Sequence, residues 1–167
     1  VDTGVDYLHP DLSDNIWTNT AEMNGTPGID DDSNGFIDDV YGWDFADGDA
    51  TPLDVFRHGT HVAGIIGAKG NNHEGVVGVC WTAKLMALKV QADGAEEMDD
   101  LAVINALQYA ADQGARIVNC SFGGEAFSQA EYDAFGRQTL QLRHIQRIGF
   151  KFAKVEPAAG QRGITTC

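Results

Sequence analysis

Apolar residues along residues 83–120 follow the pattern of a strand, a helix and a second strand. Residues 83–90 are a mostly apolar run of strand length, and residues 116–120 form another such run. The segment between them carries apolar residues at the spacing of one helix face, namely Leu101, Ile104, Leu107 and Ala111. A strand, a helix and a strand within this length predict two parallel strands joined by a right-handed crossover. The sequence therefore predicts an α/β fold with a mostly parallel sheet.

The amino-terminal half shows one further helical pattern and a long irregular stretch. Residues 58–69 are expected to form a helix, whereas residues 12–54 are rich in Gly, Asn, Asp and Pro and show no sustained period. The start of the chain is expected to be the end of a strand, which puts Asp2 at its carboxyl tip. Because ligand sites in parallel sheets collect at the carboxyl ends of the strands, Asp2 and Ser121 are expected to lie at such an edge.

The composition is that of one globular domain with a large negative charge. The chain has 167 residues, 43% of them hydrophobic, and a formal net charge of −14. This charge argues against a nucleic acid or an anionic membrane surface as a partner. No apolar run approaches the roughly 18 residues of a transmembrane helix, so no membrane span is expected.

Two histidines three residues apart lie among small residues in the stretch RHGTHVAGIIGA, residues 57–68. His58 and His61 on one helix face could be two ligands of a metal site, although the stretch lacks the Glu of the HExxH arrangement. The alternative is a general base on a tightly packed helix, and spacing does not decide which histidine it is. Asp2 followed by a downstream His matches the order of two members of a Ser-His-Asp triad.

Four motifs in one order resemble the amino-terminal part of the subtilisin-like serine proteases. They are DTGVDYLHPDL (2–12), HGTHVAGIIGA (58–68), GVVGVCWTAKLMALKV (75–90) and IVNCSFGG (117–124). The resemblance covers residues 1–135 and implies a three-layer α/β fold with a subtilisin-like central sheet, here truncated. It also implies that Asp2 is the triad carboxylate, that His58 is the base and that His61 is a packed helix residue.

The resemblance further implies what the parent protein acts on and where. Ser121, Phe122 and Gly123 would offer backbone to a polypeptide substrate in an extended conformation, in the manner of an added strand, and Phe122 would line a side-chain pocket. The parent would be a secreted, monomeric serine endopeptidase.

An acidic stretch after residue 29 follows the opening of a calcium loop. Oxygen-bearing side chains alternate along it, a Gly allows the sharp turn, and a late Asp closes the pattern. The twelfth position is Tyr41 rather than Glu, so the stretch is no EF-hand; a solvated acidic loop is the alternative. The expected calcium ligands are Asp30, Asp32, Asn34 and Asp38.

A second calcium site follows from the resemblance alone. In the family, an Asp soon after the triad Asp joins the loop that follows the His helix. Here those positions are Asp11 and residues 70–76, in which Asn72 offers a side-chain oxygen and Gly70, Glu74 and Val76 would offer carbonyl oxygens.

The nucleophilic serine of the family is missing from this sequence. None of its four serines (Ser13, Ser33, Ser121 and Ser128) lies in a GTSMA-like segment. We therefore expect a fragment of a serine endopeptidase that carries Asp2 and His58 and is inactive alone. The alternative is a non-catalytic calcium-binding or peptide-binding module.

The resemblance and the negative charge both end near residue 135. Only one of the 25 acidic residues lies after that point, whereas six of the 11 Lys and Arg residues do. We interpret residues 1–135 as a partial subtilisin-like peptidase domain and residues 136–167 as an atypical basic tail. A reading-frame change near codon 135 is one hypothesis for the tail, and a genuine divergent tail or an assembly artefact is its rival.

Overall fold

The computed structural model describes residues 1–122, 130, 133–134, 136 and 144–147. Its helices are α1 (Thr20–Asn24), α2 (His58–Gly67) and α3 (Asp100–Asp112), with a 3-10 turn η1 at Ser13–Asn15. Its strands are β1 (Gly42–Asp44), β2 (Ala87–Lys89), β3 (Ile117–Cys120) and β4 (His144–Arg147). Each helix in this described part is too short or too polar to cross a bilayer.

The strands form two parallel pairs that the start of the chain joins. β1 pairs with β2, and β3 pairs with β4. The backbone of Asp2 lies against β2, because its N–H donates to the Leu88 carbonyl at 3.1 Å and its carbonyl accepts from the Val90 N–H at 3.0 Å. The Val1 nitrogen donates to the Asn119 carbonyl at 3.1 Å on the other side. The predicted strand end at Asp2 is confirmed as the segment between β2 and β3.

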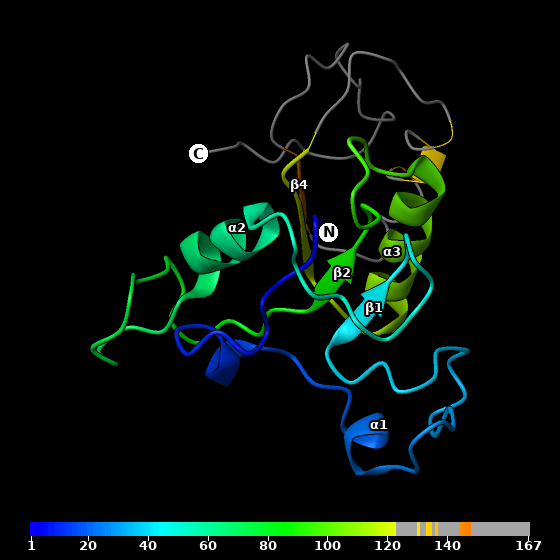
Figure 1. Cartoon of the computed structure of the whole chain (residues 1–167), viewed down its shortest axis with the longest axis horizontal. Coiled ribbons are helices and arrows are strands. Elements are labelled where there is room, and N and C mark those ends of the chain that lie inside the picture. Colours follow the sequence, from blue (N-terminus) through cyan, green and yellow to red (C-terminus); the bar gives the residue numbers. More distant parts are fainter. Residues whose placement is uncertain (123–129, 131–132, 135, 137–143, 148–167) are drawn as a thin grey trace, which may run out of the picture.

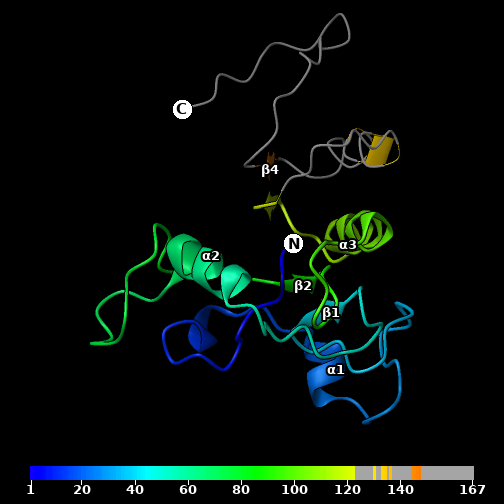
Figure 2. The same cartoon turned by 45° about the horizontal axis from the view of Figure 1, so that its top comes forward.

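The two long helices cover opposite faces of the strands, with α2 on one side and α3 on the other (Figures 1 and 2). β2 contributes to the core on both faces, since Ala87 packs with α2 and Leu88 with α3. This alternation is expected of a strand buried between two helical layers. The predicted three-layer α/β fold with a parallel sheet is confirmed.

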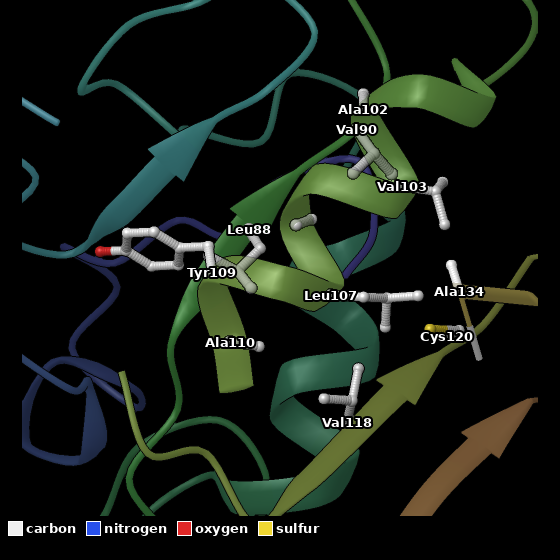
Figure 3. Packing of buried hydrophobic residues seen from close by; sticks show 11 residues of the cluster. Leu88, Val90, Ala102, Val103, Leu107, Tyr109, Ala110, Val118, Cys120 and Ala134 are labelled. Carbon is white, nitrogen blue, oxygen red and sulfur yellow. The ribbon is translucent and has the colours of Figure 1, made fainter. Parts of the chain in front are cut away.

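α3 buries a face that matches the predicted one only in part. Leu107 is fully buried, and Ile104 and Ala111 pack against the core, but Leu101 is 63% exposed. The buried face instead carries a row of alanines, which bring the helix close to β2 and β3 (Figure 3). The spacing pattern left out most positions of the buried face, which is formed by Ala102, Val103, Ala106, Leu107, Tyr109 and Ala110.

β1 lies inside the stretch that was expected to be irregular, and the sequence analysis missed it. Its three residues are too few to show a period, and it includes the charged residue Asp44. Asp44 is nevertheless buried, because its carboxylate pairs with the Lys89 ammonium of β2 at 2.8 Å. Burial lowers the pKa of Lys89, but hydrogen bonds to Asp44 and Asp93 and the charges of both outweigh it, so the pKa is raised.

Truncation of Leu107 tests the position of the α3 core. Leu107→Ala is expected to lower the free energy of unfolding by about 2–5 kcal/mol, because it removes a fully buried side chain and leaves a cavity. Leu101→Ala on the same helix should change it by less than about 0.5 kcal/mol. Urea denaturation followed by circular dichroism measures both, and equal losses would contradict this packing.

Candidate active site

The structure brings the side chains of Asp2 and His58 together. Asp2 Oδ1 lies 2.6 Å from His58 Nδ1, a short distance typical of a hydrogen bond to a carboxylate. The Asp2 side chain is 8% exposed and the His58 side chain 51% exposed. The carboxylate is thus buried behind the imidazole, while half of the ring faces solvent. Of the two histidines that spacing left open, His58 is the one that meets Asp2.

The Asp2 carboxylate is held by its own backbone. Oδ1 also accepts a hydrogen bond from the Thr3 N–H at 2.8 Å, as expected for an Asp at the start of a turn. Oδ2 is buried and has no hydrogen-bond partner among the described residues. All the ordering contacts therefore fall on the oxygen that faces His58.

α2 begins where two backbones approach unusually closely. A Cβ built at Gly59 would lie 2.1 Å from the Gly4 carbonyl oxygen and 3.1 Å from Asp2 Oδ1. Only a residue without a side chain fits there, so Gly59 allows His58 to sit beside Asp2.

As predicted, the buried face of α2 is formed by its small residues Gly59, Ala63, Gly64 and Gly67. His61, which was expected to be packed, is exposed. Asp2 engages His58 Nδ1, and the cluster of three possible metal ligands found among the described residues contains neither His58 nor His61.

The residues expected to bind substrate follow β3. Ser121 and Phe122 are both partly buried, the Asn119 amide donates to Ser121 Oγ at 2.7 Å, and Phe122 packs against the α3 core. The third, Gly123, lies outside the described residues. β3 neighbours the segment that carries Asp2, so Asp2 and Ser121 lie at the same edge of the sheet.

The acidic stretch folds around a glutamate that the sequence analysis missed. Carboxylate oxygens of Glu22, Asp30 and Asp32 lie within 4.8 Å of one another. Glu22 is 5% exposed, and it accepts hydrogen bonds from the backbone of Asp31, Asp32 and Asp38. Glu22 lies eight residues before the motif on α1, so the loop pattern could not reveal it.

Two of the expected calcium ligands take other partners. The Asp38 carboxylate accepts from the Gly28 N–H at 2.8 Å. The Asn34 amide donates to Asp32 at 3.3 Å and to Asp39 at 2.9 Å. Asp30 and Asp32 thus meet in the cluster, Asn34 borders it, and Asp38 shapes the loop.

The residues of the second expected calcium site also lie together. The buried Asp11 accepts from the Asn72 side-chain amide at 2.7 Å and from the Val76 N–H at 2.8 Å. These two hydrogen bonds hold the pKa of Asp11 below its usual value. The loop after α2 therefore closes on Asp11, as the family resemblance implied.

A buried carboxylate that binds a half-exposed histidine, at the carboxyl edge of a parallel sheet, is how nucleophilic hydrolases orient their general base. The chain belongs to the subtilase family, whose model matches residues 1–152. The match extends beyond residue 135, and the division of the chain at that residue stays a prediction.

The relatives are proteases and are much longer than this chain. Subtilisin-like protease 1 of Plasmodium falciparum (isolate 3D7) is 39% identical over 153 residues, which are 91% of this chain and 21% of that protein. The thermophilic serine proteinase of Bacillus sp. (strain AK1) is 36% identical over 74% of this chain and 25% of its own length. Fervidolysin of Fervidobacterium pennivorans, a keratinolytic enzyme related to subtilisin, has a TM-score of 0.61 at 28% identity, covering 84% of this chain and 19% of that one.

Two glycines of α2 test the close approach at the site. Gly59→Ala is expected to lower the free energy of unfolding by about 3 kcal/mol, because its methyl group would overlap the Gly4 carbonyl. Gly64→Ala is the matched control: its Cβ would meet only Val76 at 3.8 Å, so it should raise stability by about 0.5–1 kcal/mol. Thermal and urea unfolding measure both, and a tolerated Gly59→Ala would disprove the close approach.

Proposed function

We propose that this chain is part of a serine endopeptidase that cleaves polypeptides by acyl transfer, with Asp2 and His58 as two members of its triad. The observation that carries the proposal is the 2.6 Å contact between a buried carboxylate and a half-exposed imidazole. Membership of the subtilase family supports it.

The geometry supports a distinct role for each of the two residues. With Asp2 Oδ1 accepting the Nδ1 proton, the imidazole is fixed as the tautomer whose Nε2 lone pair is free. Nε2 would then take the proton of a serine hydroxyl as that oxygen attacks the peptide carbonyl, and later give it to the leaving amine. Asp2 would stay ionised and stabilise the imidazolium that forms.

The substrate would be an extended polypeptide that lies along the segment after β3. Ser121 and Phe122 follow directly on that strand and share its edge with Asp2, so backbone groups there could pair with a peptide as an added strand. Gly123 would continue this segment. The parent enzyme is proposed to be monomeric and secreted.

The nucleophilic serine is expected from a part of the protein other than this sequence. None of the four serines has a GTSMA-like context, and among the serines that the structure describes only Ser121 directly follows β3. The chain alone is therefore expected to be inactive, because triad members act as a unit. A divergent or frameshifted tail after residue 135 stays a hypothesis.

A chimera tests the proposed function. Residues 1–122 would replace the matching segment of the thermophilic serine proteinase of Bacillus sp. (strain AK1), which supplies the rest of the domain. The chimera is expected to hydrolyse a peptide ester, with kcat lowered about 10⁴-fold by Asp2→Asn and about 10⁶-fold by His58→Ala. His58→Ala removes the group that takes and returns the proton, whereas Asp2→Asn removes the charge and the acceptor that hold His58 in the correct tautomer.

His61→Ala is the matched control, since His61 lies on the same helix and is exposed. It should leave kcat within about twofold of the parent chimera. Turnover that survives His58→Ala would refute the catalytic assignment. A folded chimera without activity would favour the alternative, a non-catalytic calcium-binding or peptide-binding module.

We also propose that the cluster of Glu22, Asp30 and Asp32 binds calcium. Its ligand atoms are all carboxylate oxygens, which suit a hard cation. Among the described residues, no Lys or Arg pairs with these three carboxylates, so their mutual repulsion is offset by backbone and amide donors alone. Asp11 and Asn72 are proposed as part of a second site, as in the family.

Calcium binding is expected to be visible as thermal stabilisation. At a concentration about 100 times its Kd, one ion stabilises the native state by about 2.7 kcal/mol. Glu22→Gln should raise the Kd of the first site about tenfold or more, because it removes a charged ligand. Glu97→Gln, a change at an exposed carboxylate elsewhere, should leave it unchanged. Isothermal titration of calcium into the EDTA-treated chain measures the Kd of both variants. Equal calcium affinities of the two variants would exclude Glu22 as a ligand.

A further inference from the structure

We propose that Asp54 is a positioning residue of this site, whose carboxylate fixes the start of α2 against the Asp2–Thr3 backbone and so keeps His58 at bonding distance from Asp2. The expected effect of Asp54 on catalysis rests on the proposed protease function. The expected effect on the position of His58 rests only on the hydrogen bonds of Asp54.

Asp54 accepts five hydrogen bonds, all from groups near the start of α2. Oδ1 accepts from the Thr3 hydroxyl at 2.9 Å, the Phe56 N–H at 2.9 Å and the Arg57 N–H at 2.8 Å. Oδ2 accepts from both the N–H and the hydroxyl of Thr60, at 2.8 and 2.7 Å. One side chain thus binds the strand end, the approach to the helix and its first turn.

The first turn of α2 needs such a partner. Its N-cap residue, Arg57, makes no side-chain capping bond, and the first N–H groups of any helix lack partners within the helix. Asp54, which lies three residues before this N-cap, provides a carboxylate oxygen that accepts from the Thr60 N–H. Its negative charge also lies at the positive end of the helix dipole.

The turn that leads into His58 is strained, and Asp54 spans it. Arg57 has φ of 71°, in the left-handed region that a residue with a side chain rarely adopts. Such a conformation persists only where its surroundings fix it. The hydrogen bonds from Phe56 and Arg57 to Asp54 Oδ1 provide this restraint immediately before the catalytic histidine.

A second link runs through Thr3. Its hydroxyl donates to Asp54 and accepts from the Gly59 N–H at 2.9 Å. Thr3 follows Asp2 and Gly59 follows His58, so the neighbours of the two catalytic residues are joined directly. Asp54 orients the Thr3 hydroxyl in this link, and through it sets the separation of Asp2 and His58.

The proposal is tested first on the 167-residue chain by ¹H NMR of the His58 Nδ1 proton, which is observed far downfield when it is held in a short bond to Asp2. Asp54→Ala is expected to abolish this resonance. Asp54→Asn, which keeps one acceptor oxygen, should restore it in part. Asp99→Ala is the matched control, because Asp99 caps α3 through Leu101 and Ala102 and its loss weakens a helix without a catalytic residue.

A folded Asp54→Ala chain with an unchanged resonance would overturn the proposal, as would equal loss in Asp99→Ala. Should Asp54→Ala fail to fold, Thr3→Val decides, since it removes only the hydroxyl that joins Asp54 to Gly59. Loss of the resonance in a folded Thr3→Val chain would support the proposal, and its retention would refute it.

The catalytic consequence is measured in the chimera described above. Asp54→Ala should lower kcat about 10²-fold with KM little changed, as expected when a catalytic group is misplaced. Asp54→Asn should recover part of this loss. If Asp2→Asn and His58→Ala were without effect, the proposed function would fail while the NMR result stood. If those two variants acted as expected and Asp54→Ala did not, only the role of Asp54 would fail.

Discussion

The backbone pairing of Asp2 inside the sheet is the constraint on which the rest of the site depends. The hydrogen bonds from Asp2 to Leu88 and from Val90 to Asp2 fix its main chain, and the bond from Val1 to Asn119 ties the same segment to β3. Because Asp2 is bonded to β2 and its neighbour Val1 is bonded to β3, Asp2 has little freedom except in its side chain. The carboxylate can therefore be aimed from a rigid base, at the sheet edge where ligands of α/β proteins bind.

Precision at this site comes from contacts of the main chain rather than from large side chains. Gly59 admits the Gly4 carbonyl, and α2 packs through small residues, so the helix axis is set by backbone contact. The far end of α2 is tied as well, because the buried Asn15 amide donates to the Gly67 carbonyl at 2.9 Å. A helix that other segments fix at both ends cannot slide along its axis. The position of His58, its first residue, is therefore fixed as well.

The sequence predicted those parts of the molecule that depend on residues close to one another in the chain. The Asp2 turn, the small-residue face of α2 and the parallel β2–α3–β3 unit each left a pattern within a few residues. What it missed depends on contacts distant in sequence. Glu22 joins a loop that begins eight residues later, and β1 is identified by its parallel pairing with β2, which lies more than forty residues further along the chain. His61 was misplaced because motif resemblance carries no information on which way a side chain faces.

The arrangement is energetically unfavourable for one oxygen of the Asp2 carboxylate. Its Oδ2 is buried without a partner among the described residues, and an unsatisfied buried polar atom costs about 1–3 kcal/mol. The stabilising hydrogen bonds are all made by the other oxygen, Oδ1, with the Thr3 N–H and the His58 ring. We propose that a carboxylate arranged in this way would stabilise the imidazolium formed if His58 accepts a proton, because that is the state that triad catalysis must stabilise.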